Sequence, residues 1–129
     1  MTGPLVIVDG ANVVGSVPNG WWRDRLGAAR RLRDALPAVA ASGLGDLPGP
    51  VEVVLVVEGA ARPLAEEAAP SGVTVVAAPT TGSGDDAIVD LVTSRDGRRC
   101  VVVTADRGLR ERVTVLGADV VGPRTLPYG

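Results

Sequence analysis

The sequence predicts a single α/β domain: a mainly parallel five-stranded sheet of order 3-2-1-4-5 with helices on both faces. Short apolar runs rich in β-branched residues alternate with segments of helical periodicity, which is typical of buried parallel strands and their connecting helices. The length of 129 residues suits one domain. Right-handed crossovers, with a change of direction beside the first strand, favour this strand order. We expect the domain to span residues 1–121, followed by a tail at 122–129.

The N-terminal third is predicted to contain one strand and one long helix. An apolar run at 4–8 forms the strand, and a loop around 18–20 follows it. The helix is expected to begin near Trp21 or Trp22, because apolar residues then recur at steps of three and four. These residues are Leu26, Ala29, Leu32, Leu36 and Val39. Pro37 lies within this pattern and should kink or end the helix.

The remaining elements alternate in the same way. A loop rich in glycine and proline is expected at 42–50, the second strand at 51–57, a short helix at 63–69 and the third strand at 73–77. A flexible loop at 79–84 leads to a helix at 85–93, in which Ile88, Leu91 and Val92 should face inward. The last elements are a strand at 100–104, a helix near 109–115 and a strand near 118–121.

Composition excludes several kinds of site. His is absent, which removes a Ser-His nucleophilic pair and any His-ligated zinc site. All 13 basic residues are Arg, so a receiver domain, which usually needs a Lys near its acceptor Asp, has little support. The net charge of −2 gives no overall attraction to nucleic acid. Because neither a secretory signal nor an apolar run of membrane-spanning length is visible, we expect a cytoplasmic protein without membrane contacts.

Acidic residues stand where the predicted strands end. Asp9 follows the first strand, Glu58 the second and Asp106 the fourth, while Asp85 and Asp86 open a helix. In an open α/β sheet these positions face one crevice. Two unit charges about 4 Å apart repel by roughly 4 kcal/mol at an effective dielectric constant of 20. Protons or a divalent cation would offset this repulsion, and we take the cation as the working hypothesis.

Each of these acids also has a purely structural interpretation. Asp9 and Asn12 suit a turn in which both side chains bond their own backbone. Ser83 suits an N-cap with Asp86 three residues later, and Asp106 suits the N-cap of the helix that follows it. Glu at a strand end, as at position 58, is often only solvated, and Glu66 or Glu67 could take its place as a ligand.

Basic and aromatic residues of the first helix suggest a nucleic-acid contact. Arg23 and Arg30 are seven residues apart and are expected to share a stripe beside the buried face, where they could hold a phosphodiester backbone. Trp21 and Trp22 could stack on bases. Arg107, on the last helix, raises the same possibility. The alternative is a solvated helix face with one Trp packed on the core.

Three motifs together resemble those of PIN-like nucleases, most nearly the NYN group and its YacP-like branch. They are Val-Asp-Gly-Ala-Asn-Val at 8–13, Gly-Asp-Asp-Ala-Ile at 84–88 and Val-Thr-Ala-Asp-Arg-Gly-Leu at 103–109. The resemblance runs from the first strand to about residue 121 in the expected order. It implies a compact PIN-like α/β fold and cleavage of RNA that depends on Mg²⁺ or Mn²⁺.

The resemblance also assigns roles to residues. The first acid of the family matches Asp9, with Asn12 as the nearby polar residue. Its helix-start acid matches Asp85, and its acid after the fourth strand matches Asp106. The second acid varies among branches, and Glu58 is our candidate. The chain is shorter than YacP-like proteins, especially before the third helix and at its end, so its RNA-binding surface is less well predicted than its acids.

We therefore expect a metal-dependent ribonuclease that hydrolyses RNA phosphodiester bonds. One or two metal ions would activate water and stabilise the developing charge. The candidate metal ligands are Asp9, Asp85, Asp106, Asp86 and Glu58, and the candidate substrate contacts are Arg23, Arg30, Ser83 and Arg107. A homodimer is possible. The alternative is a catalytically inactive PIN-like module that binds RNA or a protein partner.

Overall fold

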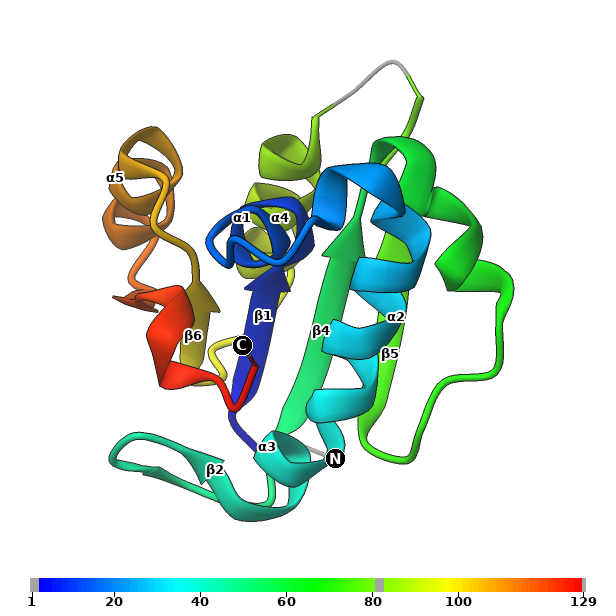
Figure 1. Ribbon diagram of the computed structural model, residues 1–129. Helices are drawn as coiled ribbons and strands as arrows, with labels where there is room; N and C mark the ends of the chain where they lie inside the picture. Colours follow the sequence, from blue (N-terminus) through cyan, green and yellow to red (C-terminus); the bar gives the residue numbers. More distant parts are fainter. Residues whose placement is uncertain (1–2, 81–82, 129) are drawn as a thin grey trace.

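Five parallel strands form the centre of the protein (Figure 1). They are seen in a computed structural model that describes residues 3–80 and 83–128. The strands are β1 (Leu5–Asp9), β4 (Glu52–Val57), β5 (Val73–Ala77), β6 (Cys100–Val103) and β7 (Asp119–Val121). Their order is β5-β4-β1-β6-β7, which confirms the predicted order 3-2-1-4-5. Residues 81 and 82 of the loop predicted at 79–84 lie outside the described residues.

Helices cover both faces of this sheet, as predicted. The α-helices are α1 (Gly10–Gly15), α2 (Arg25–Ala35), α3 (Pro37–Ser42), α4 (Gly84–Thr93) and α5 (Arg107–Val115). Three 3₁₀ segments are η1 (Trp21–Arg23), η2 (Gly59–Glu66) and η3 (Pro123–Thr125). In Figure 1, α2 lies in front of the sheet and α4 behind it. Among residues 3–80 and 83–128, no helix combines the length and the apolar character needed to cross a membrane.

The alternation of side chains along each strand separates two apolar cores. Val6 and Val8 face one core with α1, α2, α3 and η2, whereas Leu5 and Ile7 face the other with α4 and α5. Leu32 and Ile88, both without solvent exposure, anchor α2 and α4 to these cores. The tail joins the first core through Leu126, which is 4% exposed.

The structure corrects the prediction of a loop directly after the first strand. The chain instead turns at once into α1, whose N-cap is Asp9. A side chain on Gly10 would place its Cβ 2.5 Å from the carbonyl oxygen of Val56, so glycine lets α1 approach β4 closely. The helix has only six residues, including two glycines. It is therefore too short to produce a helical period and too poor in helix formers to be expected from propensity.

The first long helix also begins later than predicted. Trp21 and Trp22 belong to η1, and Asp24 then caps α2 by accepting a hydrogen bond from the Gly27 N–H at 2.8 Å. The expected break at Pro37 is confirmed, because Pro37 is the first residue of α3.

Two further segments differ from the prediction. The loop expected at 42–50 contains a small antiparallel hairpin of β2 (Gly43–Leu44) and β3 (Leu47–Pro48), whose two leucines are buried. The helix expected at 63–69 is η2, which starts four residues earlier and ends at Glu66. The hairpin strands have two residues each, which is too short for a periodic pattern to reveal.

Candidate acidic site

The site lies at the carboxyl ends of β1, β4 and β6 and begins with a buried carboxylate. Asp9, the last residue of β1, is only 4% exposed. The Thr104 hydroxyl, fully buried just after β6, donates to Asp9 Oδ2 at 2.8 Å. On the other side, the Asn12 N–H donates to Asp9 Oδ1 at 3.4 Å. Two neighbouring strands and one helix therefore fix the position of this carboxylate.

A short chain of hydrogen bonds links Asp9 to the segment after β6. Thr104 Oγ1 also accepts from the Asp106 N–H at 3.1 Å. The side-chain oxygen of Asn12 accepts from the Ala105 N–H at 2.8 Å. Asn12 thus holds α1 against the loop that carries Asp106. Thr104 belongs to the third motif, but it was not predicted from the sequence as a site residue. The pattern that could have indicated it is a polar residue directly after an apolar run.

Asp85 and Asp106 approach one another from two helix starts. Asp85 lies in the first turn of α4. Asp106 is the N-cap of α5 and accepts from the Leu109 N–H at 2.9 Å. The capping role predicted for it is therefore confirmed. Partial burial and then the negative charge of Asp106 raise the pKa of Asp85. These two carboxylates are therefore electrostatically coupled.

Glu58 joins the group from the end of β4. Its Oε2 accepts from the Gly84 N–H at 3.1 Å, which places a negative charge at the N-terminus of α4. A Cβ on residue 84 would lie 2.1 Å from that oxygen, so only glycine leaves room for the contact. Glu58 thereby links the end of β4 to the start of α4.

The environment of Asp9 raises its pKa from 3.8 to about 6. Burial is the main cause, and the negative charges of Asp85 and Glu58 add to it. The hydrogen bonds from Thr104 and Asn12 oppose the rise. Asp9, Asp85, Asp106 and Glu58 thus form one interacting acidic group, with Asp9 at its buried centre.

Other predicted site residues have different partners. Asp86 is exposed and pairs with Arg112 of α5 at 3.0 Å. Ser83 is the N-cap of α4 and accepts from the Asp86 N–H at 3.3 Å, as the structural interpretation foresaw. These two residues border the acidic group without joining its hydrogen bonds.

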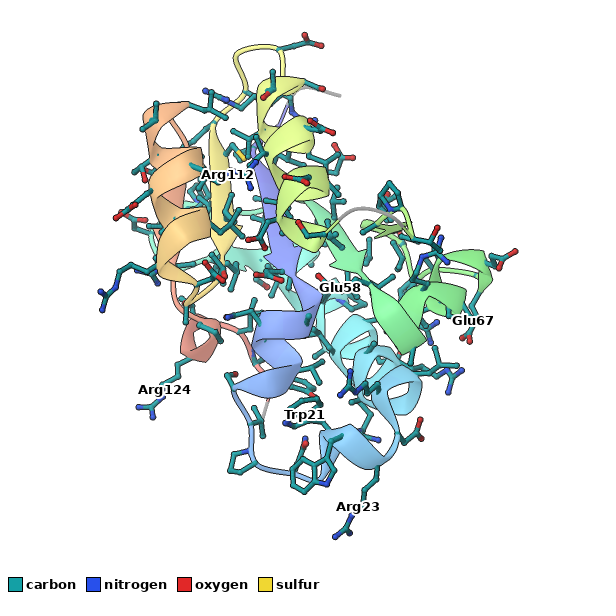
Figure 2. The ribbon with its side chains drawn as sticks, turned by 90° about the horizontal axis from the view of Figure 1, so that it is seen from above. Trp21, Arg23, Glu58, Glu67, Arg112 and Arg124 are labelled. Carbon is teal, nitrogen blue, oxygen red and sulfur yellow. The ribbon has the colours of Figure 1, made fainter. Side chains whose placement is uncertain are left out.

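The two alternatives to Glu58 lie on η2 and at its end. Glu67 pairs with Arg30 at 2.6 Å and with Arg33 at 3.0 Å. The hydrogen bond from Arg30 is the main cause that lowers the pKa of Glu67 to about 2. Glu66 is exposed. Figure 2 shows Glu58 near the centre of the molecule and Glu67 toward its edge. Of the three, Glu58 is the acid that interacts with Asp9.

The predicted basic stripe is not formed. Arg23 lies in η1, before the cap of α2, so it does not share a helix face with Arg30. Its guanidinium carbon is 5.8 Å from the centre of the Trp22 ring, and the side chain points outward in Figure 2. Arg30 is engaged with Glu67. Arg107, the first residue of α5, is exposed beside Asp106.

The acids fit a hydrated divalent ion better than a closed metal cage. Within the described part of the chain, no three Asp, Glu or Cys side chains are close enough together to form a ready-made metal site. Mg²⁺ is usually held by one or two carboxylates and keeps several waters, and Mn²⁺ also prefers oxygen ligands. Coupled carboxylates around a buried Asp9 match that requirement.

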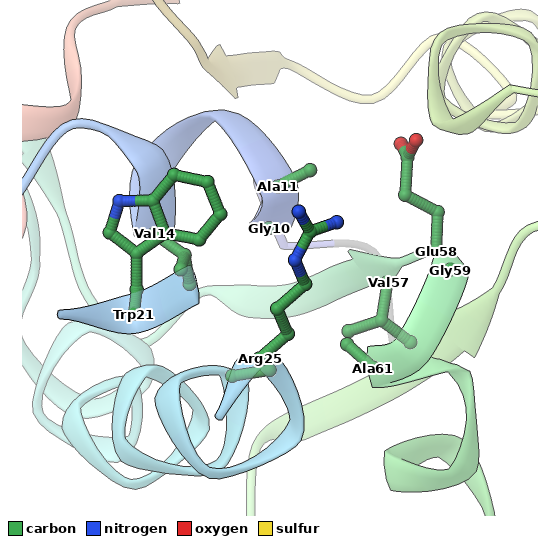
Figure 3. A pocket seen from close by; sticks show the side chains of 10 residues that line it. Gly10, Ala11, Val14, Trp21, Arg25, Val57, Glu58, Gly59 and Ala61 are labelled. Carbon is green, nitrogen blue, oxygen red and sulfur yellow. The ribbon is translucent and has the colours of Figure 1, made fainter. Parts of the chain in front are cut away.

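A small pocket adjoins the acids. It has a volume of about 200 Å³ and lies between α1, the start of α2 and the end of β4 (Figure 3). Trp21 lines one side and Glu58 the other, with the Arg25 side chain between them. The acidic group and the pocket therefore share Glu58 as a common wall.

Comparison with known proteins identifies the fold. No family model and no curated protein sequence matches the chain. Among solved structures, Rae1 (YacP) from Bacillus subtilis superposes with a TM-score of 0.69, and a single-substitution variant of it with a TM-score of 0.70. In both cases the identity is 16%, and the match covers 94% of this chain and 70% of the other. The protein therefore has the α/β fold of Rae1 (YacP), in agreement with the YacP-like resemblance of its three motifs.

Proposed function

We propose that the protein is a metal-dependent ribonuclease that hydrolyses RNA phosphodiester bonds in the cytoplasm. The main support is the buried carboxylate of Asp9, held by Thr104 and Asn12 and surrounded by three further acids. A buried, hydrogen-bonded acid with a raised pKa in a crevice at strand ends is a common feature of functional sites. The order of the three motifs and the shared fold agree with this function.

In this proposal Asp9, Asp85 and Asp106 hold Mg²⁺ or Mn²⁺, with Glu58 as a fourth acid. When bound, the ion would polarise the phosphate and water and offset the mutual repulsion of the carboxylates. Thr104 and Asn12 keep Asp9 and the Asp106 loop in position. Asp86, paired with Arg112, would act only as an outer acid.

RNA would approach across the exposed residues around the acids. Arg107 is next to Asp106, and Ser83 stands at the start of α4. Arg23 would contact RNA farther along the strand. Arg30 contributes less, since Glu67 already neutralises it. The homodimer stays a prediction.

The direct test is cleavage of labelled RNA with Mn²⁺ or Mg²⁺ and with EDTA. We expect Asp9→Asn, Asp85→Asn and Asp106→Asn each to lower the rate by more than the roughly 10- to 100-fold that loss of an outer-shell partner costs. Asp46→Asn is the matched control, because the Asp46 side chain is 97% exposed on the hairpin. Metal-dependent cleavage that survives all three site substitutions would rule the proposal out.

A second candidate function is an inactive module that binds RNA or a protein. The absence of a three-ligand cluster among the described acids favours it. Calorimetric titration with Mn²⁺ separates the two, because the ribonuclease should release or absorb heat on binding the ion and Asp9→Asn should abolish that signal.

A further inference from the structure

The pocket beside the acidic group has its own chemistry. Its apolar lining includes Ala11 and Val14 of α1 and Val57 at the end of β4, and the indole of Trp21 closes one side. Two charged groups, Arg25 and Glu58, stand in it at different places (Figure 3). An apolar pocket that holds one cationic and one anionic group suits an apolar ring that carries polar groups on its edge.

The size of the pocket restricts what can enter. Its volume is about 200 Å³, whereas sites for drug-sized ligands usually measure about 300–1,000 Å³. A single ring system can fill this space. A ring that enters meets the Arg25 guanidinium, which lies over the Trp21 indole and offers a plane on which a base can stack.

The charged groups complement the edge of a nucleobase. The guanidinium of Arg25 lies over the Trp21 ring, with its carbon 5.3 Å from the ring centre, so its donors stand between the indole and Glu58 (Figure 3). Glu58 uses Oε2 to accept from Gly84, and its carboxylate has further lone pairs. Arg donates to base carbonyl and ring-nitrogen acceptors, while Glu accepts from exocyclic amino groups.

The position of the pocket connects it to the proposed chemistry. Gly10 and Ala11, which line it, directly follow Asp9 in the chain, and Glu58 belongs to both places. A nucleotide whose phosphate lies at the acids therefore has its base within reach of the pocket. A paired base cannot enter, because it stays within the helical stack unless it is flipped out.

We propose that this pocket binds one unpaired nucleobase against the Arg25 guanidinium that lies over Trp21, with Glu58 at the other side. In RNA, the base is then held next to the phosphate that lies at the acids. The assignment of that RNA as a substrate rests on the proposed function, whereas binding of the base does not.

The pocket can be tested by binding without metal. The chain has two Trp residues, so Trp22→Phe leaves Trp21 as the sole fluorescent indole. We would titrate this variant in EDTA with a short single-stranded oligoribonucleotide, its abasic counterpart and its duplex. The single strand should quench Trp21 saturably, and the abasic strand and the duplex should bind about five- to a hundredfold more weakly, as loss of one stacked base predicts. Equal binding of all three would overturn the proposal.

Two variants that fill the pocket localise the binding. Ala11→Leu, on α1, and Ala61→Leu, on η2, each add a branched side chain from a different wall. Ala38→Leu is the matched control, since Ala38 is exposed on α3 away from the pocket. We expect the first two to weaken binding at least tenfold at unchanged melting temperature, with no effect of the third. If neither folded filling variant weakens binding, the base lies elsewhere.

The same oligonucleotide separates this inference from the proposed function. Cleavage with Mn²⁺ that is insensitive to the pocket variants and to base removal would support the ribonuclease and refute the pocket. Base-dependent quenching without any Mn²⁺-dependent cleavage would keep the pocket and refute the ribonuclease. A free nucleoside monophosphate that binds more tightly than the oligonucleotide would refute an RNA strand as the ligand.

Discussion

At the scale of single residues, Asp9 is a carboxylate that the fold buries almost completely from solvent. Burial of its carboxylate is unfavourable, and the Thr104 hydroxyl and the Asn12 amide recover only part of the lost hydration. The raised pKa of Asp9 reflects the part of the lost hydration that these two hydrogen bonds do not replace. Such a residue weakens the free protein, so its presence indicates a role that stability alone does not explain.

The stability of the metal-free protein should depend on pH through Asp9. Its pKa rises from 3.8 in the unfolded chain to about 6 in the native state, so between these values the native state binds the extra proton. The free energy of unfolding should therefore fall as pH rises through this window, by at most about 3 kcal/mol from this residue. The loss is complete once the pH is well above the native pKa of Asp9.

Denaturant unfolding in EDTA at several pH values measures this dependence, with Asp9→Asn as the comparison. Asp85, whose pKa is also raised, acts in the same direction in both proteins, and Glu67 titrates near pH 2, below the window. The difference between the two curves thus gives the contribution of Asp9 together with its coupling to Asp85 and Glu58. Parallel curves would show that Asp9 is not perturbed by burial.

At the scale of elements, the start of α4 depends on one glycine. The Gly84 N–H binds Glu58, and a Cβ at this position would lie 2.1 Å from the glutamate oxygen. Gly108 is the second residue of α5, where a Cβ would meet Asp106 Oδ1 at an ordinary 3.5 Å. Of these two glycines in the first turns of α4 and α5, Gly84 is therefore the one whose replacement would disturb an acid.

We expect Gly108→Ala to stabilise the protein by roughly 0.4–1 kcal/mol, because alanine costs less backbone entropy in a helix. Gly84→Ala should forgo that gain and lower the affinity for Mn²⁺, since Glu58 is displaced from the acidic group. Urea unfolding and calorimetric titration of both variants measure these effects. Equal behaviour of the two alanines would mean that Glu58 has no positional role.

The elements also show how far the sequence could predict the structure. Short apolar runs, alternating with helical segments, identified all five strands of the main sheet, and the rule for parallel strands brought Asp9 and Asp106 to one edge. The helix α1 and the β2–β3 hairpin were missed, because six residues and two residues per strand carry no periodicity. They form because tertiary contacts, such as Gly10 against Val56, stabilise them.

Side-chain partners were predictable only when they were local. The caps formed by Ser83 and Asp106 follow from neighbouring residues and were foreseen. The pairs of Arg30 with Glu67 and of Arg112 with Asp86 join residues 37 and 26 positions apart, so no local pattern reveals them. Arg30, a predicted substrate contact, and Asp86, a predicted metal ligand, are therefore already engaged in ion pairs.

At the scale of the whole molecule, the proposed RNA binding must come from local charge, because the net charge is −2. Many arginines are already used: Arg30, Arg33, Arg98, Arg99 and Arg112 are in ion pairs. None of the ion pairs in the described part of the chain involves Arg23, Arg25, Arg31, Arg107 or Arg124. Of these, Arg25 lines the pocket beside Glu58, and Arg107 directly follows Asp106.

This distribution predicts that two arginines will behave differently toward RNA. For single strands, each phosphate contact contributes about 0.7 to the slope of log affinity against log salt concentration. Arg107→Gln should lower that slope by about this amount, since an exposed cation beside Asp106 is lost. Arg30→Gln should leave it nearly unchanged, because Glu67 already neutralises Arg30. Fluorescence anisotropy of a labelled single-stranded RNA in EDTA, at several salt concentrations, measures both slopes. A larger effect at Arg30 than at Arg107 would mean that RNA crosses the α2 face instead of the start of α5, and that the Arg30–Glu67 pair opens when RNA binds.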